Sequence, residues 1–444
     1  MKARMLVGLL LTAVLLVATV STGQAQKIPL PQTSTPSEPS ALAAPPGWIV
    51  ETIDSPNDVG RYASIAFNLF APVISYYDAT NKDLRVAAPA SSGANCGPSN
   101  TWTCQVVDNT ADVGQYSSIA FPVSAGLLTI GPGIAYFDAT NGALKFAEFR
   151  AGLVGKWVIS TIAPGGGGFL NGRFAAVKYD SNGTVRIAYQ SQDPFQVTSL
   201  SYAHSVSGGG NCGVGAAAGL WQCDRIDSSG GTGMYISLDV SSTNEPFISY
   251  YDSSNADLKV ANPVSSGGNC GPGNTWTCQV VDNAGDVGQY SSIAFPSGLS
   301  FFGPGIAYFD ATNSALKFAE RSCIGFPCTW HIFTIASGAG TVTGRYASLK
   351  YDSTGVVHIG YQVTAASSAA LWYAHSVPGG GDCGLGSAAG LWQCAAIDSG
   401  SGIGAYASLA LSGTRPYIAY YDGGNGDLKL SLVGLQLYLP IILR

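Results

Sequence analysis

Short runs in which apolar and polar residues alternate cover the chain from about residue 48 to residue 433. A run opened by tryptophan, such as Trp48–Asp54, precedes a run that follows Gly-x, such as Tyr62–Phe67. Two more runs complete each unit, as in Ile134–Asp138 and Leu144–Ala147. Alternation over this length is typical of β-strands, and turn residues separate the runs. Each unit therefore predicts a four-stranded antiparallel sheet.

The unit is repeated seven times. Seven of the eight tryptophans open the tryptophan run, at intervals of 54 to 64 residues: Trp48, Trp102, Trp157, Trp221, Trp276, Trp330 and Trp392. Repetition of a four-stranded unit at such a period is typical of β-propellers. No helical periodicity follows the N-terminal segment. We predict an all-β, seven-bladed β-propeller of four-stranded antiparallel blades.

The two ends of the repeat array are incomplete in complementary ways. Residues 48–54 form a tryptophan run with no blade before it, and the last unit, residues 404–432, has no tryptophan run after it. If the tryptophan run is the outermost strand of a blade, the N-terminal run can complete the seventh blade by pairing near Leu428. Such pairing hides two exposed sheet edges. We therefore expect a ring closed by the N-terminal strand in the last blade.

The segments outside the repeats have their own patterns. Residues 1–25 resemble a signal peptide, with basic Lys2 and Arg4, an apolar stretch and small residues, Gly23 to Ala25, before an expected cut after Ala25. A membrane anchor is the alternative interpretation. Residues 26–47 are rich in proline and predict an extended linker. The apolar tail, residues 434–444, is too short to span a bilayer, so we expect no transmembrane span in the mature chain.

Composition narrows the choice of partner and compartment. Only 11% of the residues are charged and the net charge is −6, which disfavours nucleic acid or an anionic membrane as the partner. Ten cysteines fall into five close pairs around the loops that lead into tryptophan runs: Cys96 with Cys104, Cys212 with Cys223, Cys270 with Cys278, Cys323 with Cys328, and Cys383 with Cys394. The even count and the N-terminal segment favour five disulfides over zinc sites, and a protein that is secreted or held at the cell surface.

One face of the predicted ring collects a repeated polar position. Because strand direction alternates, the loops entering the innermost strands lie on the face opposite the cysteine loops. The variable residue of the Gly-x-Tyr/Phe motif would then surround the mouth of the central channel. We predict ligand contacts at five of these positions: Arg61, Gln115, Arg173, Gln289 and Arg345. Arginines can clamp a carboxylate or phosphate bidentately, although pairing with carboxylates such as Asp58 or Asp112 is the alternative.

Blades 3 and 6 depart from the common pattern. Gln190 and Gln362 stand where we expect the turn aspartate of the other blades, and longer loops follow, at residues 191–199 and 363–370. Insertions in repeat proteins map to one face and often bear the binding site. We therefore add Gln190 and Gln362 to the predicted ligand residues.

The same face carries Asp-x-x-Asn in five blades, as in Asp78/Asn81 and Asp252/Asn255. Asp and Asn at this spacing stabilise hairpin turns by accepting hydrogen bonds from nearby amides. Calcium binding with a third oxygen ligand, such as Asp83, is the alternative. We expect no metal ion, no other cofactor and no catalytic residue, because His204 and His375 have no acidic partner in register and no nucleophile beside them.

Runs such as Ile248–Asp252 and Gly133–Gly142, followed by a tryptophan strand, resemble the repeats of secreted bacterial propellers. They are similar to the BNR repeats of sialidases and to NHL-type propellers, over residues 48 to 433. The resemblance implies a propeller, and for a sialidase it implies an arginine triad, which Arg61, Arg173 and Arg345 match in number. A sialidase also uses a tyrosine–glutamate pair, and no glutamate lies in register near that face.

These observations favour an extracellular recognition module without catalytic activity. We expect its ligand to be a glycan or an anionic extracellular polymer bound at the channel mouth. A sialidase-like or other glycoside hydrolase is one alternative, which requires two carboxylates on one face. A structural cell-surface protein without a small ligand is another.

Overall fold

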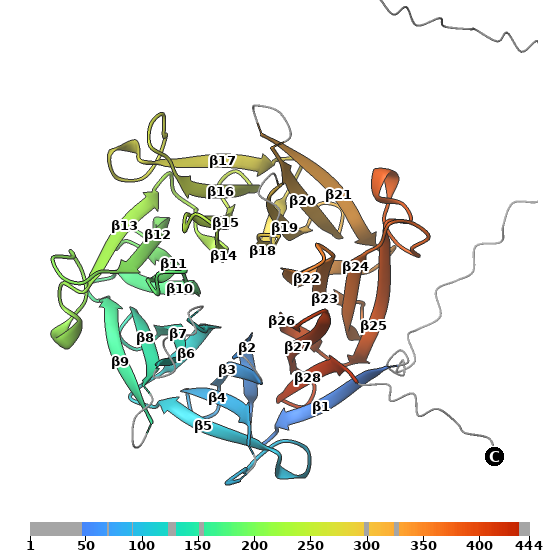
Figure 1. Ribbon diagram of the computed structural model, residues 1–444, viewed down its shortest axis with the longest axis horizontal. Helices are drawn as coiled ribbons and strands as arrows, with labels where there is room; N and C mark the ends of the chain where they lie inside the picture. The colour runs from blue at the N-terminus through green and yellow to red at the C-terminus, as the bar shows by residue number, and fades with distance from the viewer. Residues whose placement is uncertain are drawn as a thin grey trace, which may run out of the picture. The chain divides into compact units, whose positions relative to one another are not determined.

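The computed structural model describes residues 47–68, 71–90, 92–122, 130–150, 155–296, 302–323 and 328–434. These residues form seven four-stranded antiparallel sheets arranged as the blades of a propeller, as predicted (Figure 1). Four short 3-10 turns accompany them, and no described helix is long and apolar enough to cross a bilayer. The predicted signal peptide, the predicted linker up to residue 46, and the tail after Gly434 lie outside the described residues.

The innermost strand of each blade comes first in the chain, and the outermost strand comes last. The strands of blades 1 to 4 are β2 (Val59–Phe67), β3 (Pro72–Asp78), β4 (Asp83–Pro89), β5 (Trp102–Asp108); β6 (Val113–Ala120), β7 (Ile130–Asp138), β8 (Ala143–Arg150), β9 (Lys156–Ala163); β10 (Leu170–Tyr179), β11 (Val185–Gln192), β12 (Thr198–Ser205), β13 (Trp221–Asp227); and β14 (Met234–Val240), β15 (Pro246–Asp252), β16 (Asp257–Pro263), β17 (Trp276–Asp282).

Blades 5 to 7 repeat this order, and the first strand of the chain completes the last blade. Their strands are β18 (Val287–Ala294), β19 (Phe302–Asp310), β20 (Ala315–Ser322), β21 (Thr329–Ser337); β22 (Val342–Tyr351), β23 (Val357–Thr364), β24 (Ala369–Ser376), β25 (Trp392–Gly400); and β26 (Ile403–Ser412), β27 (Arg415–Asp422), β28 (Asp427–Val433), β1 (Trp48–Asp54). The 3-10 turns are η1 (Pro98–Asn100), η2 (Gly215–Ala217), η3 (Pro272–Asn274) and η4 (Gly386–Ala388).

Ring closure follows the predicted pairing. Strand β1 runs antiparallel to β28 (Figure 1). Trp48 lies opposite Val433, and Asp54 lies opposite Leu428. Ile53 of β1 then packs in one apolar cluster with Ile65 and Ile74 of blade 1. The closing strand therefore belongs to the sheet of blade 7 and contributes to the interface with blade 1.

The core lies between the blades. Both faces of each sheet pack on a neighbour, so the first tyrosine of each Tyr-Tyr or Tyr-Phe pair is fully buried, as at Tyr76, Tyr250 and Tyr420. The tyrosine pairs are therefore part of the core between the blades. Burial of apolar surface of this kind stabilises a fold by about 25 cal/mol per Å².

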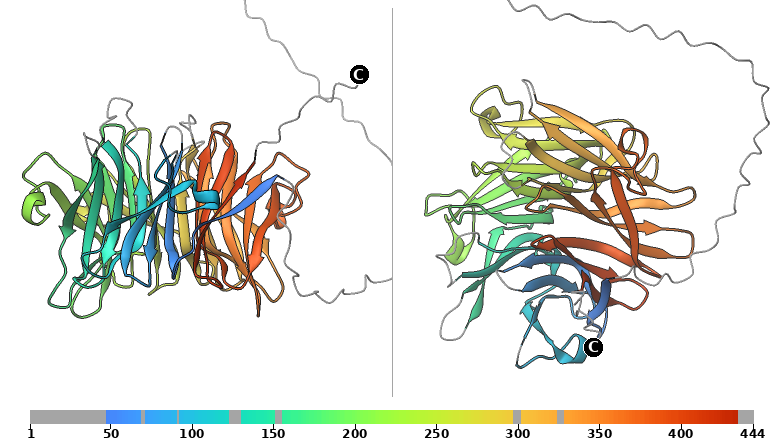
Figure 2. Two further views of the ribbon diagram at one scale, coloured as in Figure 1. Left: turned by 90° about the horizontal axis from the view of Figure 1, so that it is seen from below. Right: turned by 45° about the vertical axis from the view of Figure 1, so that its right-hand side comes forward.

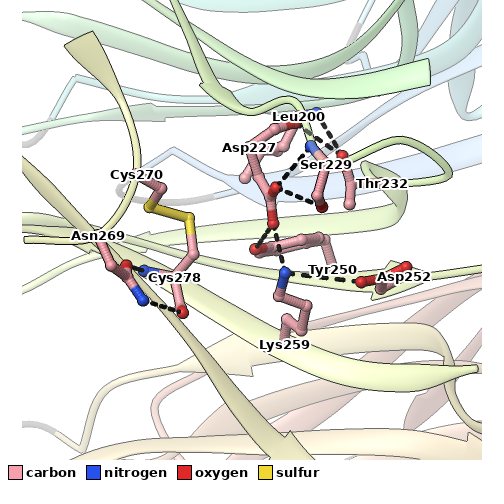
Figure 3. The surroundings of a disulfide bond; sticks show 10 residues. All are labelled: Leu200, Asp227, Ser229, Thr232, Tyr250, Asp252, Lys259, Asn269, Cys270 and Cys278. Carbon is pink, nitrogen blue, oxygen red and sulfur yellow. Dashed lines mark hydrogen bonds and ion pairs between the residues drawn. A yellow bond between two sulfur atoms is a disulfide. The ribbon is translucent and has the colours of Figure 1, made fainter. Parts of the chain in front are cut away.

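Buried ion pairs join the outermost strand of one blade to the next blade. Figure 3 shows Asp227 of β13, which accepts a hydrogen bond of 2.7 Å from the Tyr250 hydroxyl and lies 2.5 Å from the Lys259 ammonium nitrogen. Burial alone would raise the pKa of Asp227, but the bonds from Lys259 and Tyr250 outweigh it and lower that pKa. Asp108 and Asp282 each accept hydrogen bonds from the equivalent tyrosine and lysine at their own interfaces.

The predicted cysteine pairing is confirmed within the described residues, and no cysteine there is free. Cys96 is bonded to Cys104, Cys212 to Cys223, Cys270 to Cys278, Cys323 to Cys328, and Cys383 to Cys394. In each pair except that of blade 5, the second cysteine lies inside the outermost strand, two residues after its tryptophan: Cys104 in β5, Cys223 in β13, Cys278 in β17 and Cys394 in β25. In blade 5, Cys328 comes just before β21. Four disulfides therefore tie a loop to the outermost strand itself.

Three of the cysteine loops also bond the outermost strand of the preceding blade. The amide of Gly271, next to Cys270, donates to the carbonyl of Ile226, and the amide of Gly384 donates to that of Ile335. Disulfides therefore shape loops that link neighbouring blades. Seen edge-on, the blades stand side by side with loops at both ends (Figure 2).

Candidate functional site at the channel mouth

An aromatic ring surrounds the propeller axis at one mouth of the channel. Each blade contributes the aromatic residue of its Gly-x-Tyr/Phe motif, and neighbouring ring centroids lie 4.4 to 5.2 Å apart around the whole circle. Among the described residues the members are Tyr62, Tyr116, Phe174, Tyr235, Tyr290, Tyr346 and Tyr406. Together with the residues that follow them, they line a hollow of about 180 Å³.

The local backbone explains why this motif needs glycine. Gly60 has φ of +103°, and a Cβ built on it would lie 2.7 Å from the Cα of Leu428 in the preceding blade. No side chain fits so close an approach. The aromatic residue two positions later also has a positive φ, 54° at Tyr62, and the pairing of β2 with β3 shifts register there. This irregularity breaks the strand alternation at the point where the aromatic joins the ring.

The tyrosine hydroxyls of the ring lie close to one another. Burial, followed by the nearby hydroxyls of Tyr116 and Tyr406, raises the pKa of Tyr62 well above its usual value. The same causes act at Tyr235 and Tyr346. These three tyrosines therefore stay uncharged at physiological pH and present polar hydroxyl groups within an aromatic frame.

Three of the five predicted contact residues at the mouth are paired with an aspartate. The Arg61 guanidinium lies 2.6 Å from the carboxylate of Asp58, which also accepts a hydrogen bond of 2.8 Å from the Tyr421 hydroxyl of blade 7. Gln115 donates to Asp112, and Gln289 donates to Asp286, each carboxylate again being held by a tyrosine of the preceding blade. The carboxylate-paired alternative therefore applies to Arg61.

Arg173 and Arg345 have a different environment. Their guanidinium carbons lie 5.7 Å from the ring centre of Phe137 and 5.8 Å from that of Phe309. Neither has a carboxylate within 4.0 Å in the described part of the chain. Arg173 donates only a long bond of 3.4 Å to Gln192, and the buried Nε of Arg345 has no acceptor among the described residues.

The sequence of the blade interface accounts for this difference. Where the preceding blade offers a tyrosine hydroxyl, as at Tyr77, an aspartate lies opposite to accept its bond. Where it offers phenylalanine, as at Phe137 and Phe309, the position three before the arginine is Leu170 or Val342. A carboxylate there would have no hydroxyl partner. Blades 3 and 6 therefore carry arginines that have no carboxylate partner in the part of the chain that the structure describes.

The structure corrects the position in the repeat that we predicted for Gln190 and Gln362. Gln190 pairs with Arg173 in the sheet, the position that Tyr77 occupies opposite Arg61, so it replaces the second aromatic of the pair and not the turn aspartate. Both glutamines are buried, and they donate to the backbone carbonyls of Thr232 and Ile403 in the next blade. Their bonds join blades beneath the surface.

The long loops of blade 3 expose aromatic and apolar side chains. Phe195 is 87% exposed and Phe169 is 45% exposed, and Val197 is exposed to a similar degree as Phe169. These loops are residues 164–169, before β10, and residues 193–197, after β11. They touch where Gly168 approaches Pro194. Both loops lie at the end of the β10–β11 hairpin that carries Arg173 and Gln192. The equivalent loops of blade 6, at residues 338–341 and 365–368, contain no aromatic residue.

The Asp-x-x-Asn motif is a turn motif in the structure. Asp78 accepts hydrogen bonds from the amide and the side chain of Asn81, and Asp252 does the same for Asn255. The one group of candidate metal ligands in the described residues joins Asp382 to Cys383 and Cys394. Those two sulfurs are bonded to each other, which removes them as metal ligands.

Sequence reasoning missed the role of the motif's constant residue. Attention to the variable position before the aromatic hid the fact that an aromatic present in every blade must converge on the axis of a closed ring. The signal was present, because all seven motifs contain Tyr or Phe directly after the variable residue. The distinction between paired and unpaired arginines was also readable from the Tyr or Phe of the preceding blade.

Comparisons with known proteins assign no family to this chain. No family model matches the sequence, and no curated protein matches it. Among solved structures, a lectin from Aleuria aurantia, in complex with Fucα1-6GlcNAc, has a TM-score of 0.43 and 13% identity, covering 77% of this chain and 97% of the lectin. A Hadza microbial sialidase also has a TM-score of 0.43, with 11% identity over 84% of this chain and 65% of the sialidase.

Proposed function

We propose that this protein is a non-enzymatic, extracellular recognition module that binds an anionic glycan or polymer at the channel mouth. The observation that carries the proposal is the state of Arg173 and Arg345. Both stand beside the aromatic ring with no carboxylate partner in the described residues, whereas Arg61 is neutralised by Asp58.

The chemistry of these groups fits a carboxylate-bearing sugar. A guanidinium presents its donors in a planar fork that matches the two oxygens of a carboxylate, and Arg stays charged at any physiological pH. Aromatic rings offer apolar faces to the C–H groups of a sugar, and their edges accept polar neighbours. Arg173 has such rings available, because the exposed Phe169 and Phe195 lie on the loops at the same end of its hairpin.

The extracellular part of the proposal is supported by the cysteines. Five disulfides within the described residues are typical of chains that fold in an oxidising compartment. Thiols in the cytosol are normally kept reduced. A glycan or polymer outside the cell is the partner that this location would offer.

A glycan array followed by calorimetric titration of each hit tests the proposal. We expect hits that carry carboxylate or sulfate groups, and a loss of affinity of at least about tenfold for Arg173→Ala, since a charge-assisted bidentate contact is worth more than about 1.4 kcal/mol. Arg345→Ala tests the contribution of the equivalent arginine in blade 6. Arg61→Ala is the matched control, because its guanidinium already has a carboxylate partner.

The outcomes separate three functions. Retained affinity in the Arg173→Ala, Arg345→Ala double variant would overturn the arginine site. Release of free sugar from a bound hit would show a hydrolase, and Asp58→Asn, Asp112→Asn and Asp286→Asn would then identify its carboxylates on this face. No binding to any anionic glycan or polymer would favour a structural protein instead.

A further inference from the structure

A cluster of charged side chains lies inside the channel. It is on the far side of the aromatic ring from Arg173 and Arg345. The inner strands line a partly enclosed cavity of about 630 Å³ there, and Phe67, Phe121 and Leu411 are also among its lining residues. This volume is within the range of small-molecule sites. Lys178, Asp239 and Lys350 line it.

The three charged residues occupy one repeated position. Each stands four residues after the aromatic of its own blade: Phe174, Tyr235 and Tyr346. The other four blades have alanine at this position, namely Ala66, Ala120, Ala294 and Ala410. A small residue from four blades and a long charged one from three leaves open space beside the charges. The repeat therefore places the charged side chains at one level of the channel.

The charges inside the cavity do not balance. Lys178 and Asp239 form an ion pair of 3.0 Å between blades 3 and 4, and Asp239 also accepts a bond of 2.8 Å from the amide of Phe295. Lys350 has no carboxylate within 4.0 Å among the described residues. Two cations and one anion leave one excess positive charge in a partly enclosed space.

We propose that this cavity binds a small oxyanion, a carboxylate or a sulfate or phosphate group, between the ammonium groups of Lys178 and Lys350. The bound anion balances the excess positive charge. It also accepts hydrogen bonds from the N–H groups of Lys178 and Lys350 that do not bond Asp239. Lysine has three N–H donors, so Lys178 can bond Asp239 and the anion at once. This site is separate from the proposed glycan site, because the aromatic ring lies between them.

Protonation of Lys350 gives the site a pH dependence. The charge of Lys178, followed by burial, lowers the pKa of Lys350 to about 7. The titratable groups that line the cavity with it are Lys178, Asp239, Tyr179 and Tyr351. Burial raises the pKa of both tyrosines, and the two lysines lower that of Asp239 despite its burial, so none of these three changes charge between pH 6 and pH 8. An anion should therefore bind more tightly at pH 6 than at pH 8.

The test is calorimetric titration of the full chain with sodium sulfate and, separately, sodium acetate at low ionic strength. Both anions keep their charge from pH 6 to pH 8, so a change in affinity reports on the protein. We expect at least one to bind, several-fold more tightly at pH 6, and Lys350→Met to lower its affinity at least tenfold. A preference for sulfate or for acetate identifies the class of ligand. Lys156→Met, at the exposed start of β9, is the matched control.

The variants also separate this site from the arginine site. Loss of sulfate binding in Lys350→Met, with retention in the Arg173→Ala, Arg345→Ala double variant, supports the channel site whatever the glycan array shows. The reverse result, or equal affinity of the native chain and Lys350→Met at pH 6, overturns it. Lys350→Met should keep the native melting temperature, because it removes a charge without a partner, so a loss of binding is not a loss of fold.

Discussion

The carboxylate of Asp54, in the first strand of the chain, accepts a hydrogen bond of 2.6 Å from the hydroxyl of Tyr76 in the first blade. Its cation is Arg85, at 3.3 Å, which Asp78 shares at the same distance. The effect of burial therefore exceeds the effects of Tyr76 and Arg85, and the pKa of Asp54 is raised. The equivalent Asp227 has Lys259 at 2.5 Å, and its pKa is lowered. The two aspartates occupy equivalent positions in two blades, yet the pKa of one is raised and the pKa of the other is lowered.

Asp227→Asn should destabilise the protein at pH 7 by about 3 kcal/mol, because it leaves the partly buried Lys259 without its nearest counter-charge. Asp54→Asn, the matched variant, should change stability by less than about 1 kcal/mol, since the ionised form of Asp54 is already disfavoured by burial. Urea denaturation measures both. An equal loss in the two variants would contradict this account.

Acid should weaken the native chain in a way that depends on Asp227. A carboxylate whose pKa is lower in the folded state stabilises the fold above its unfolded pKa, near 3.8, and this stabilisation is lost as pH falls through the folded pKa. Asp108 and Asp282 act in the same direction. Melting temperatures recorded from pH 6 to pH 2 should fall less steeply for Asp227→Asn. An unchanged slope would show that Asp227 does not contribute.

Removal of β1 should open the ring. A chain that starts at Ser55 lacks the partner of β28 and exposes Leu428 and Leu430, which are buried in the native protein. We expect a fall in melting temperature of about 10 °C or more and a tendency to associate through the free edge. Thermal unfolding and light scattering measure these effects. A chain that starts at Gly47 keeps β1 and is the control.

Two glycines with almost the same backbone angle separate strain from crowding. Gly114 has φ of +106°, and a Cβ there would lie 2.7 Å from the Cα of Leu84 in the preceding blade. Gly166 has φ of +104° and open space around it. Both alanine variants bear the cost of a positive φ, about 1–3 kcal/mol. Gly114→Ala should lose about 1–3 kcal/mol more, because it also pushes two blades apart. Equal losses in denaturation would show that the blades can yield.

The disulfide of blade 4 should contribute measurable stability. Cys270 and Cys278 are separated by 8 residues, for which the chain-entropy model gives about 2.5 kcal/mol. Their paired replacement by serine should lower stability by about that amount, measured by denaturation without reductant. Reduction of the native protein followed by alkylation should lower it further, because four other disulfides among the described residues are then also lost.

Much of the architecture was readable from the chain because the information is local and repeated. The spacing of seven tryptophans defines the blades, the incomplete ends at Trp48 and Leu428 define the closure, and short spacings define the cysteine pairs. Each of these features lies within one repeat or at the ends of the array. Their physical basis is strand alternation and the need to cover sheet edges, which act at the level of sequence.

The site was decided by contacts between repeats. Arg61 and Arg173 occupy the same motif position, but Asp58 neutralises Arg61, whereas Leu170 stands in the place of that aspartate in blade 3. This difference follows the opposing residue of the preceding blade, Tyr421 for Arg61 and Phe137 for Arg173. The ion pair between Lys178 and Asp239 also forms across a blade interface. Register shifts beside each ring aromatic displace side chains from simple alternation. Which residues oppose each of these charges is a property of the closed ring, because the opposing residues come from strands that only folding brings together.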